Sequence, residues 1–394
     1  DVLAFVPEDR RFKRLRREAR ALLAQYPDPA ERPALFGVPV GVKDIFHVDG
    51  FVTRAGSEVP AELLQGTEAE SVRRLKAAGA LIMGKTVTTE FAYFAPGPTR
   101  NPHNPAHTPG GSSSGSAAAV AAELCPLALG TQTIGSVTRP AAFCGVVGYK
   151  PTYERISRAG VIPLSPSVDH IGPFARDVAG MALVAAVLVE GWNTAAAASQ
   201  PARARLGVPV GDYLQRSTAK GRAHFRATCD RLATAGFEIR SVVAMPDFDA
   251  IYARHNLLVA AETAQVHAQW FAQYGESYHQ KTADLIQHGQ TVSRADLAVA
   301  LNGREQLRGE LTALMEANQI DIWISPSAPG AAPQGLDSTG DPVMNLPWTH
   351  SGLPTIGLPS GAAAGGLPFG LQLAARFGAD EMLFAWATEI EKAV

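Results

Sequence analysis

The chain has 394 residues, 46% of them hydrophobic, and a formal net charge of −2. This length supports a large buried core, and the near-neutral charge excludes a strongly basic surface of the kind that recruits nucleic acid or an anionic membrane. The three cysteines form neither a disulfide framework nor a Cys-x-x-Cys pair, so we expect a reducing, cytoplasmic setting and a site without metal or cofactor.

Short strands and helices are expected to alternate through the first half of the chain. In chain order they are a charged amphipathic helix (10–26), one strand or two paired strands (33–45), a helix (68–79), a strand (80–84), a proline-rich loop (96–109), a glycine- and serine-rich run (110–116), a helix (117–123), a strand (126–130) and a buried helix (178–189). This alternation is typical of an α/β fold. No apolar run reaches the roughly 18 residues of a transmembrane helix.

The second half of the chain has a different pattern. Residues 193–200 predict a loop or a weakly ordered insertion, and beyond them the expected elements are long helices (215–235, 246–272, 293–317), buried strands (320–326, 354–359, 368–374) and a last helix (379–392). There is no internal repeat and no long linker. We therefore predict one domain over residues 1–394, with a helical insertion at about 210–318.

The segment GVPVGVKD, residues 37–44, ends an apolar strand-like run with Lys43. Burial disfavours the charged form of an amine and lowers its pKa, which makes a buried lysine a candidate base. From this segment alone, a lysine whose flexible stem carries the amine to solvent is the stronger interpretation.

The run PGGSSSGS, residues 109–116, combines glycines, which let the backbone approach another group, with serines that supply hydroxyls. It precedes a predicted helix, whose free N–H groups bind anions. A phosphate loop is disfavoured because the usual Gly-Lys-Ser/Thr ending is absent. A functional loop and a flexible Gly/Ser loop are about equally supported by this run alone.

The segment LGTQTIGSVTRPA, residues 129–141, places Ser136 in a predicted tight turn between a strand and a helix. Such a turn exposes a nucleophile and aligns successive backbone N–H groups as an oxyanion hole. It is not the Gly-x-Ser-x-Gly elbow, because Thr138 replaces the second glycine. His170 is a candidate base, although a lone histidine is more often a structural hydrogen-bonding group.

In order and spacing, these three segments resemble the amidase signature family, and Ser136 lies 24 residues after Ser112, the separation found in that family. Further blocks similar to the family cover nearly the whole chain: KAAGALIMGKT (76–86), SAAAVAA (116–122), CGVVGYKPTYERIS (144–157), VDHIGPFARD (168–177), ISPSAPGAAP (324–333) and GLPFGLQLAAR (366–376). The resemblance implies an α/β/α sandwich with a central mixed, mostly parallel twisted sheet.

Carried over by position, the resemblance assigns Ser136 as the nucleophile, Ser112 as a bridging serine held after a cis, non-proline peptide bond, and Lys43 as the base. The backbone N–H groups expected to hold the oxyanion are those of Thr133, Ile134, Gly135 and Ser136. In this mechanism neutral Lys43 accepts a proton from Ser112, which accepts one from Ser136 as Ser136 attacks the carbonyl. The relay then returns a proton to the leaving amine, and water hydrolyses the acyl-enzyme by the same path.

Around the nucleophile the sequence departs from the common family form, which has an acidic residue at position 132, glycine at 134 and arginine two residues after the nucleophile. Here stand Gln132, Ile134 and Thr138, and the arginine comes one residue later, at Arg139. This pattern resembles the malonamidase branch, in which the matching arginine pairs with a substrate carboxylate; the planar guanidinium suits that task. An Arg139 paired with a protein carboxylate is equally compatible, and the apolar bulk of Ile134 favours a more hydrophobic acyl or carbamoyl group.

We expect Arg139, Gly111 and Gln132 to bind substrate. The aromatic side chains that are candidates for the acyl pocket are Phe91, Tyr93, Phe94 and Trp348, although aromatic residues more often fill cores.

The leading functional prediction is hydrolysis of the C–N bond of small amides. Carbamate (urethane) or ester hydrolysis uses the same machinery and stays open. An amidase subunit of a tRNA amidotransferase complex is disfavoured by the neutral charge and the altered signature, and a non-catalytic binding protein by the presence of all three catalytic positions. The expected partner is a small amide or carbamate, without nucleic acid or membrane, and the family implies a homodimer as a candidate assembly.

Overall fold

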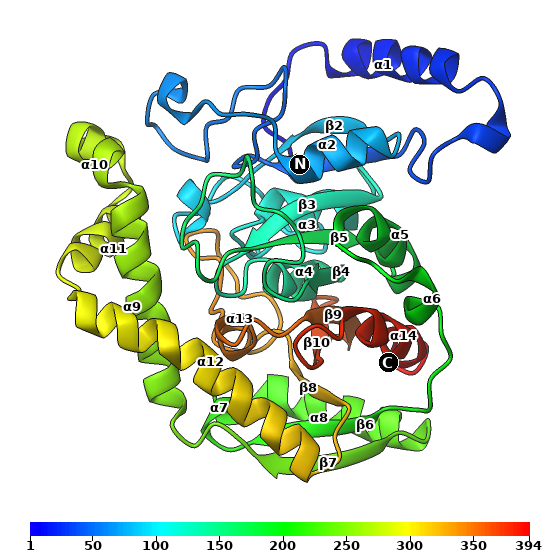
Figure 1. The fold of residues 1–394 in the computed structure, drawn as a ribbon, viewed down its shortest axis with the longest axis vertical. Coiled ribbons are helices and arrows are strands. Elements are labelled where there is room, and N and C mark those ends of the chain that lie inside the picture. The colour runs from blue at the N-terminus through cyan, green and yellow to red at the C-terminus, as the bar shows by residue number, and fades with distance from the viewer.

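The computed structural model describes residues 1–394, and its centre is one sheet of ten strands in the order β2-β1-β3-β5-β4-β9-β10-β8-β6-β7 (Figure 1). The strands are β1 (Pro39–Lys43), β2 (Leu81–Thr86), β3 (Leu127–Gln132), β4 (Val147–Lys150), β5 (His170–Ala175), β6 (Arg205–Val210), β7 (Glu238–Val243), β8 (Ile322–Pro326), β9 (Thr355–Ala362) and β10 (Pro368–Ala374).

Fourteen α-helices surround the sheet. They are α1 (Arg11–Gln25), α2 (Glu70–Ala77), α3 (Ser114–Ala121), α4 (Thr138–Cys144), α5 (Val178–Leu188), α6 (Thr194–Ala197), α7 (Asp212–Gln215), α8 (Ala219–Thr234), α9 (Phe248–Val266), α10 (Ala268–Tyr274), α11 (Gln280–Gln290), α12 (Arg294–Ala317), α13 (Leu346–His350) and α14 (Asp380–Glu391). Four short 3₁₀ helices lie at Pro29–Glu31, Ala61–Leu64, Glu90–Ala92 and Gly275–Ser277.

Helices cover both faces of the sheet, as the alternation of side chains along β3 illustrates. Leu127 and Leu129 pack in one apolar cluster with residues of α2, α5 and α14, whereas Ala128 packs in a second cluster with residues of α3 and α4. Successive side chains of a strand point to opposite faces, so a strand that is apolar at successive positions must be covered on both sides. The predicted α/β/α sandwich is confirmed.

The prediction of a mixed sheet is also confirmed, but the expected predominance of parallel pairs is wrong. Strand β1 is parallel to β2 and β3, and β6 is parallel to β7 and β8. The other five pairings, all in the middle of the sheet, are antiparallel. Two features of the chain produce these antiparallel pairs. Strands β9 and β10 form a hairpin, and β4 and β5 run side by side in opposite directions, between the parallel pairs at the two edges of the sheet.

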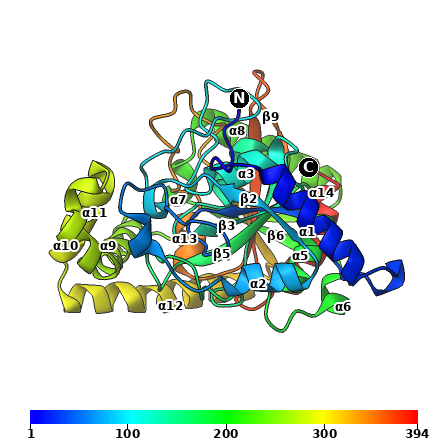
Figure 2. The ribbon, with the colours of Figure 1, turned by 90° about the horizontal axis from the view of Figure 1, so that it is seen from above.

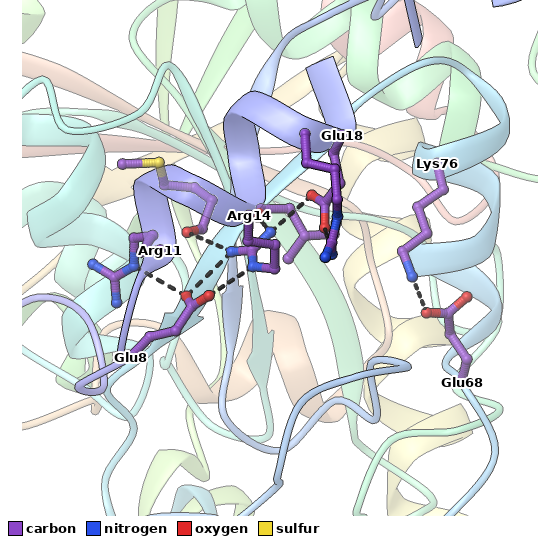
Figure 3. Close-up of polar contacts among 9 residues, drawn as sticks. Glu8, Arg11, Arg14, Glu18, Glu68 and Lys76 are labelled. Atoms are coloured by element: carbon purple, nitrogen blue, oxygen red, sulfur yellow. Dashed lines mark hydrogen bonds and ion pairs between the residues drawn. The ribbon is translucent and has the colours of Figure 1, made fainter. Parts of the chain in front are cut away.

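Helix α1 lies at the edge of the sheet and has no buried residue, so polar contacts attach it there. Arg14 donates to the backbone carbonyl of Ile82 in β2 at 2.9 Å and pairs with Glu8 and Glu18 at 2.6 and 2.8 Å (Figure 3). The charged helix predicted over residues 10–26 is thus held at the edge of the sheet by the hydrogen bonds and ion pairs of Arg14.

The second half of the chain forms a helical extension, α9 to α12, on one side of the sheet (Figures 1 and 2). The segment 210–318, expected to be helical, also contains the edge strand β7, so that expectation is wrong at residues 238–243. The helix expected over 246–272 is interrupted at His267, between α9 and α10, and residues 194–197 form the short helix α6. None of the helices combines the length and apolar character needed to cross a bilayer.

Candidate functional site

Lys43 is the last residue of β1, and its side chain is fully buried. Its Nζ atom lies 2.7 Å from Ser112 Oγ and 2.8 Å from Thr131 Oγ1, and no carboxylate forms an ion pair with it. Burial lowers the pKa of Lys43 well below its ordinary value, although the Asp169 carboxylate opposes this shift. The solvent-exposed alternative is therefore wrong. Burial favours the neutral form of this amine, which lies within hydrogen-bonding distance of two hydroxyl groups.

The loop that carries Ser112 is fixed to the neighbouring strand. The peptide bond between Gly111 and Ser112 is cis, as the resemblance implies. The next residue, Ser113, donates its hydroxyl to the backbone carbonyl of Thr131 and accepts from the backbone N–H of Thr131, both at 3.2 Å. Helix α3 begins directly after, at Ser114. The run 110–116 is thus a buried, hydrogen-bonded turn that continues into the first residues of α3, and not a flexible linker.

The turn after β3 presents a row of free donors. The backbone N–H groups of residues 133–136 donate to no backbone or side-chain acceptor within the protein. The next two N–H groups, of Val137 and Thr138, both donate to Gln132 Oε1, at 2.8 and 2.9 Å. A side chain at position 135 would not fit, because a Cβ atom there would lie 2.3 Å from Asn345 Oδ1. Four consecutive free N–H groups are suited to stabilising a negative oxygen.

Helix α13 supports this turn through the side chain of Thr349. Thr349 donates its hydroxyl to the backbone carbonyl of Ile134 at 2.7 Å and accepts from Gln132 Nε2 at 3.0 Å. Gln132 is fully buried, and both ends of its amide are occupied inside the protein. The expected role of Gln132 in substrate binding therefore does not fit its position: it shapes the turn.

Ser136 and Ser112 line the same small cavity, which we call the Ser136 pocket. Its volume is about 10 Å³, and its lining residues are Ala92, Tyr93, Phe94, Ser112, Thr133, Ile134, Ser136, Arg139, Leu164 and Pro342. This is room for about one water molecule. Of the four aromatic candidates, Tyr93 and Phe94 line the pocket. Phe91 and Trp348 are core residues instead, packed against Tyr278 and Tyr213, respectively.

Arg139 reaches the Ser136 pocket from α4, with only 1% of its surface exposed. It donates to the carbonyls of Gly111, at 2.6 Å, and Gly340, and to Thr339 Oγ1 at 3.2 Å. No protein carboxylate forms an ion pair with it, and its Nε has no partner. Burial lowers the pKa of Arg139 to about 10, so it stays positive at neutral pH. The interpretation that Arg139 pairs with a protein carboxylate is not what the structure shows.

Three residues near the site were not anticipated from the sequence. Thr131 contacts Lys43, Thr349 contacts the turn, and Asp169 accepts a hydrogen bond from Thr133 Oγ1 at 2.6 Å. Burial raises the pKa of Asp169 to about 6. A polar residue inside an apolar strand run, such as Thr131 in β3, was the available signal for the first of them.

His170 does not line the Ser136 pocket. Its Nδ1 lies 2.7 Å from the backbone carbonyl of Val168, and burial lowers its pKa well below the ordinary value. The structural role, rather than that of a base for Ser136, therefore fits His170.

Residues 9–384 match the amidase family. The chain is 34% identical over 416 residues to a glutamyl-tRNA(Gln) amidotransferase subunit from Synechococcus sp. (strain RCC307), covering 91% of this chain and 84% of that protein. It is 33% identical over 398 residues to the AtzE subunit of 1-carboxybiuret hydrolase from Pseudomonas sp. (strain ADP), covering 93% and 86%. In structure it is similar to a crystallised amidase, with a TM-score of 0.88 and 32% identity over 99% of this chain and 92% of that chain.

These similarities extend over nearly the whole length of both the chain and its relatives. They include the segments that carry Lys43, Ser112 and Ser136, which all lie within the matched residues 9–384. The chain therefore belongs to the amidase family, whose members hydrolyse carbon–nitrogen bonds other than peptide bonds.

Proposed function

We propose that this protein hydrolyses the C–N bond of small, carboxylate-bearing amides through an acyl-enzyme on Ser136. The observation that carries the proposal is the buried amine of Lys43, which lacks a carboxylate partner and lies 2.7 Å from the hydroxyl of Ser112, a residue that shares a cavity with Ser136. A neutral amine beside a hydroxyl is a proton acceptor, and an activated hydroxyl is a nucleophile.

Each step follows from these positions. Lys43 accepts the Ser112 proton, Ser112 accepts the Ser136 proton, and Ser136 Oγ forms a bond to the substrate carbonyl carbon. The developing oxyanion is held by the free N–H groups of residues 133–136, and each such donor typically contributes about 3–4 kcal/mol to lowering the barrier. The C–N bond then breaks, and the amine departs with the proton that Lys43 and Ser112 return. Water repeats the sequence on the acyl-enzyme.

The positive charge of Arg139 supports a carboxylate on the acyl side. Arg139 lines the Ser136 pocket and forms no ion pair, and its place three residues after Ser136 in the sequence resembles that of the malonamidase branch. We expect Arg139→Ala to raise KM for malonamate at least about tenfold and to leave an uncharged amide of equal size nearly unaffected. Equal effects on both amides would remove the carboxylate from the proposal.

A serine label tests the nucleophile directly. We expect a fluorophosphonate to modify Ser136 and no other serine, and Ser136→Ala to lose both labelling and turnover while its circular dichroism is unchanged. Modification of a different serine, or normal turnover by Ser136→Ala, would exclude the mechanism. A panel of matched amide, carbamate and ester substrates separates the amidase from the urethanase or esterase alternative.

The relatives support a second candidate function. Two of them are named as parts of larger enzymes, a glutamyl-tRNA(Gln) amidotransferase and a 1-carboxybiuret hydrolase. The second candidate is therefore a catalytic subunit that needs a partner for its activity. Purification of the protein from its own host, followed by measurement of its mass in solution, distinguishes the candidates: a monomer or homodimer with full amide turnover excludes an obligate partner.

A further inference from the structure

A second cavity adjoins the Ser136 pocket. It has a volume of about 520 Å³, and the two share Ala92, Thr133 and Leu164 as lining residues. We call it the Thr131 cavity, because Thr131, the hydroxyl partner of Lys43, lies on its wall. Its size is typical of small-molecule sites, whereas the Ser136 pocket holds about one water molecule. A substrate that extends beyond its reacting amide group therefore needs a larger cavity beside the Ser136 pocket.

The polar groups that line the Thr131 cavity are mainly acceptors. His170 is 2% exposed; its Nδ1 donates to the carbonyl of Val168, so its unpartnered Nε2 is an acceptor. Asp169 and Glu190 also line the cavity, and neither forms an ion pair; both oxygens of Asp169 accept hydrogen bonds within the protein, whereas the exposed carboxylate of Glu190 has no partner. The one cationic side chain there, Arg158, is paired with Glu154 at 3.4 Å. The cavity thus favours a group with N–H donors and positive charge.

The position of the cavity indicates which part of a substrate enters it. Thr131 and Thr133 line it, whereas Ser136 and Arg139 do not. The acyl carbonyl must lie at Ser136, and its carboxylate at Arg139. The leaving nitrogen must lie near the Lys43–Ser112 pair that returns its proton, and Thr131, which lines the cavity, is a hydrogen-bond partner of Lys43.

We propose that the Thr131 cavity is the leaving-group site, and that it selects amides whose amine part carries an additional ammonium or N–H donor group. This inference rests on the proposed amide hydrolysis. When the C–N bond breaks, its electron pair stays on nitrogen, the nitrogen takes the proton of Ser112, and Lys43 reprotonates Ser112. The product amine is then released into the cavity, and water replaces it at the acyl-enzyme.

The test uses three malonamates with the same acyl group: unsubstituted, N-propyl and N-(2-aminoethyl). The last two leaving groups are nearly equal in size, and only one is cationic. We expect the unmodified protein to prefer the aminoethyl over the propyl substrate in kcat/KM by about fivefold, the effect of one further hydrogen bond. In His170→Phe this preference disappears. Because each value is a ratio within one preparation, incomplete folding of a variant does not affect it.

A second variant tests whether the volume of the Thr131 cavity limits the size of the leaving group. Ala159 is exposed and lines the cavity. We expect Ala159→Trp to lower kcat/KM for both N-substituted malonamates relative to the unsubstituted one by about tenfold or more, through overpacking. The matched control is Ala233→Trp on α8, an exposed alanine outside the cavity, which leaves all three ratios unchanged.

The outcomes separate the two proposals. Unchanged ratios in Ala159→Trp, or a preference of the unmodified protein for N-propyl, would overturn the leaving-group site while amide hydrolysis stands. Failure of the unmodified protein to hydrolyse any of the three would overturn the proposed function and the inference with it.

Discussion

Two buried lysines on neighbouring strands have opposite surroundings. Lys43 is the last residue of β1, and Lys85 in β2 pairs in register with Val42, the residue that precedes Lys43. Lys85 forms a buried ion pair with Asp44 at 2.7 Å and donates to Thr53 Oγ1 at 3.0 Å. Lys43 has only hydroxyl partners. Burial lowers the pKa of both. A carboxylate opposes this shift in each case, Asp169 for Lys43 and Asp44 for Lys85, but only Asp44 forms a direct ion pair, so Lys43 is the better candidate base.

A third buried lysine shows that burial alone does not create a catalytic base. Burial lowers the pKa of Lys150 to about 7, but its Nζ donates to the backbone carbonyls of Pro151 and Leu353. A carbonyl has no proton to give. The feature that distinguishes Lys43 is a hydroxyl neighbour, Ser112, that lines the cavity of Ser136.

The largest expected effect concerns Lys43 itself. We expect Lys43→Met to lower kcat/KM by at least about 10⁴-fold, as loss of a member of a catalytic unit does in serine hydrolases. The free energy of unfolding is not expected to fall by more than about 1 kcal/mol, because no ion pair is broken. Steady-state kinetics and urea unfolding check the two parts. Retention of a hundredth of the activity would show that Lys43 is not the base.

Substitution of Lys85 is expected to lower stability and to leave turnover nearly unchanged, the reverse of the result expected for Lys43. Lys85→Met leaves Asp44 buried without its partner, which typically lowers the free energy of unfolding by about 3–5 kcal/mol. Adding Asp44→Asn is expected to recover a large part of that loss. Turnover per folded molecule stays close to that of the unmodified protein. A catalytic loss in Lys85→Met that stability does not explain would remove the distinction between the two lysines.

The pH dependence sharpens the comparison. Only neutral Lys43 accepts a proton, so kcat/KM is expected to rise tenfold per pH unit below the lowered pKa of Lys43 and to level off above it. Between this pKa and the ordinary value of 10.5, the unfolded chain binds more protons at this position than the folded one, so the contribution of Lys43 to stability increases with pH. The Lys85→Met variant keeps the rate profile, measured on matched folded protein. A kcat/KM that does not fall toward acid pH, down to the lowest pH at which the protein stays folded, would contradict the assignment.

The structure brings together residues that no single segment of the sequence identified. Lys43 and Ser112 lie within hydrogen-bonding distance and Ser136 lines the same cavity as Ser112, whereas only the order and spacing of the three segments, through the family resemblance, had related them. The direction of β9 and β10 depends on how the chain turns between strands, which apolar patterns do not encode. The edge strand β7 was missed because only one of its six residues is buried, so its sequence, EIRSVV, lacks a clear apolar period.

Contacts between distant segments explain the other differences. The polar Thr131 stands out in an apolar strand run, but its position does not indicate a partner, and Thr349 has no local signal at all. Their partners lie 88 and 215 residues away, at Lys43 and Ile134. No local pattern indicates such a pairing. Gln132 was expected to bind substrate, but only the fold shows that its amide is used by Thr349 and by the turn itself.

The smallest expected effect concerns the turn of residues 133–136. It tests whether the alignment of this turn depends on the hydroxyl of Thr349, as the proposed role of Lys43 depends on the hydroxyl of Ser112. The carbonyl of Ile134 and the N–H of Gly135 belong to one peptide plane, so the bond from Thr349 to that carbonyl directs the N–H to the opposite side. We expect Thr349→Val to lower kcat about tenfold with little change in KM, because loss of alignment affects the transition state more than substrate binding. Thr349→Ser keeps the hydroxyl and restores most of kcat. If valine and serine lower kcat equally, the contribution of Thr349 is packing; if KM rises instead, the residue acts on substrate binding and not on the oxyanion donors.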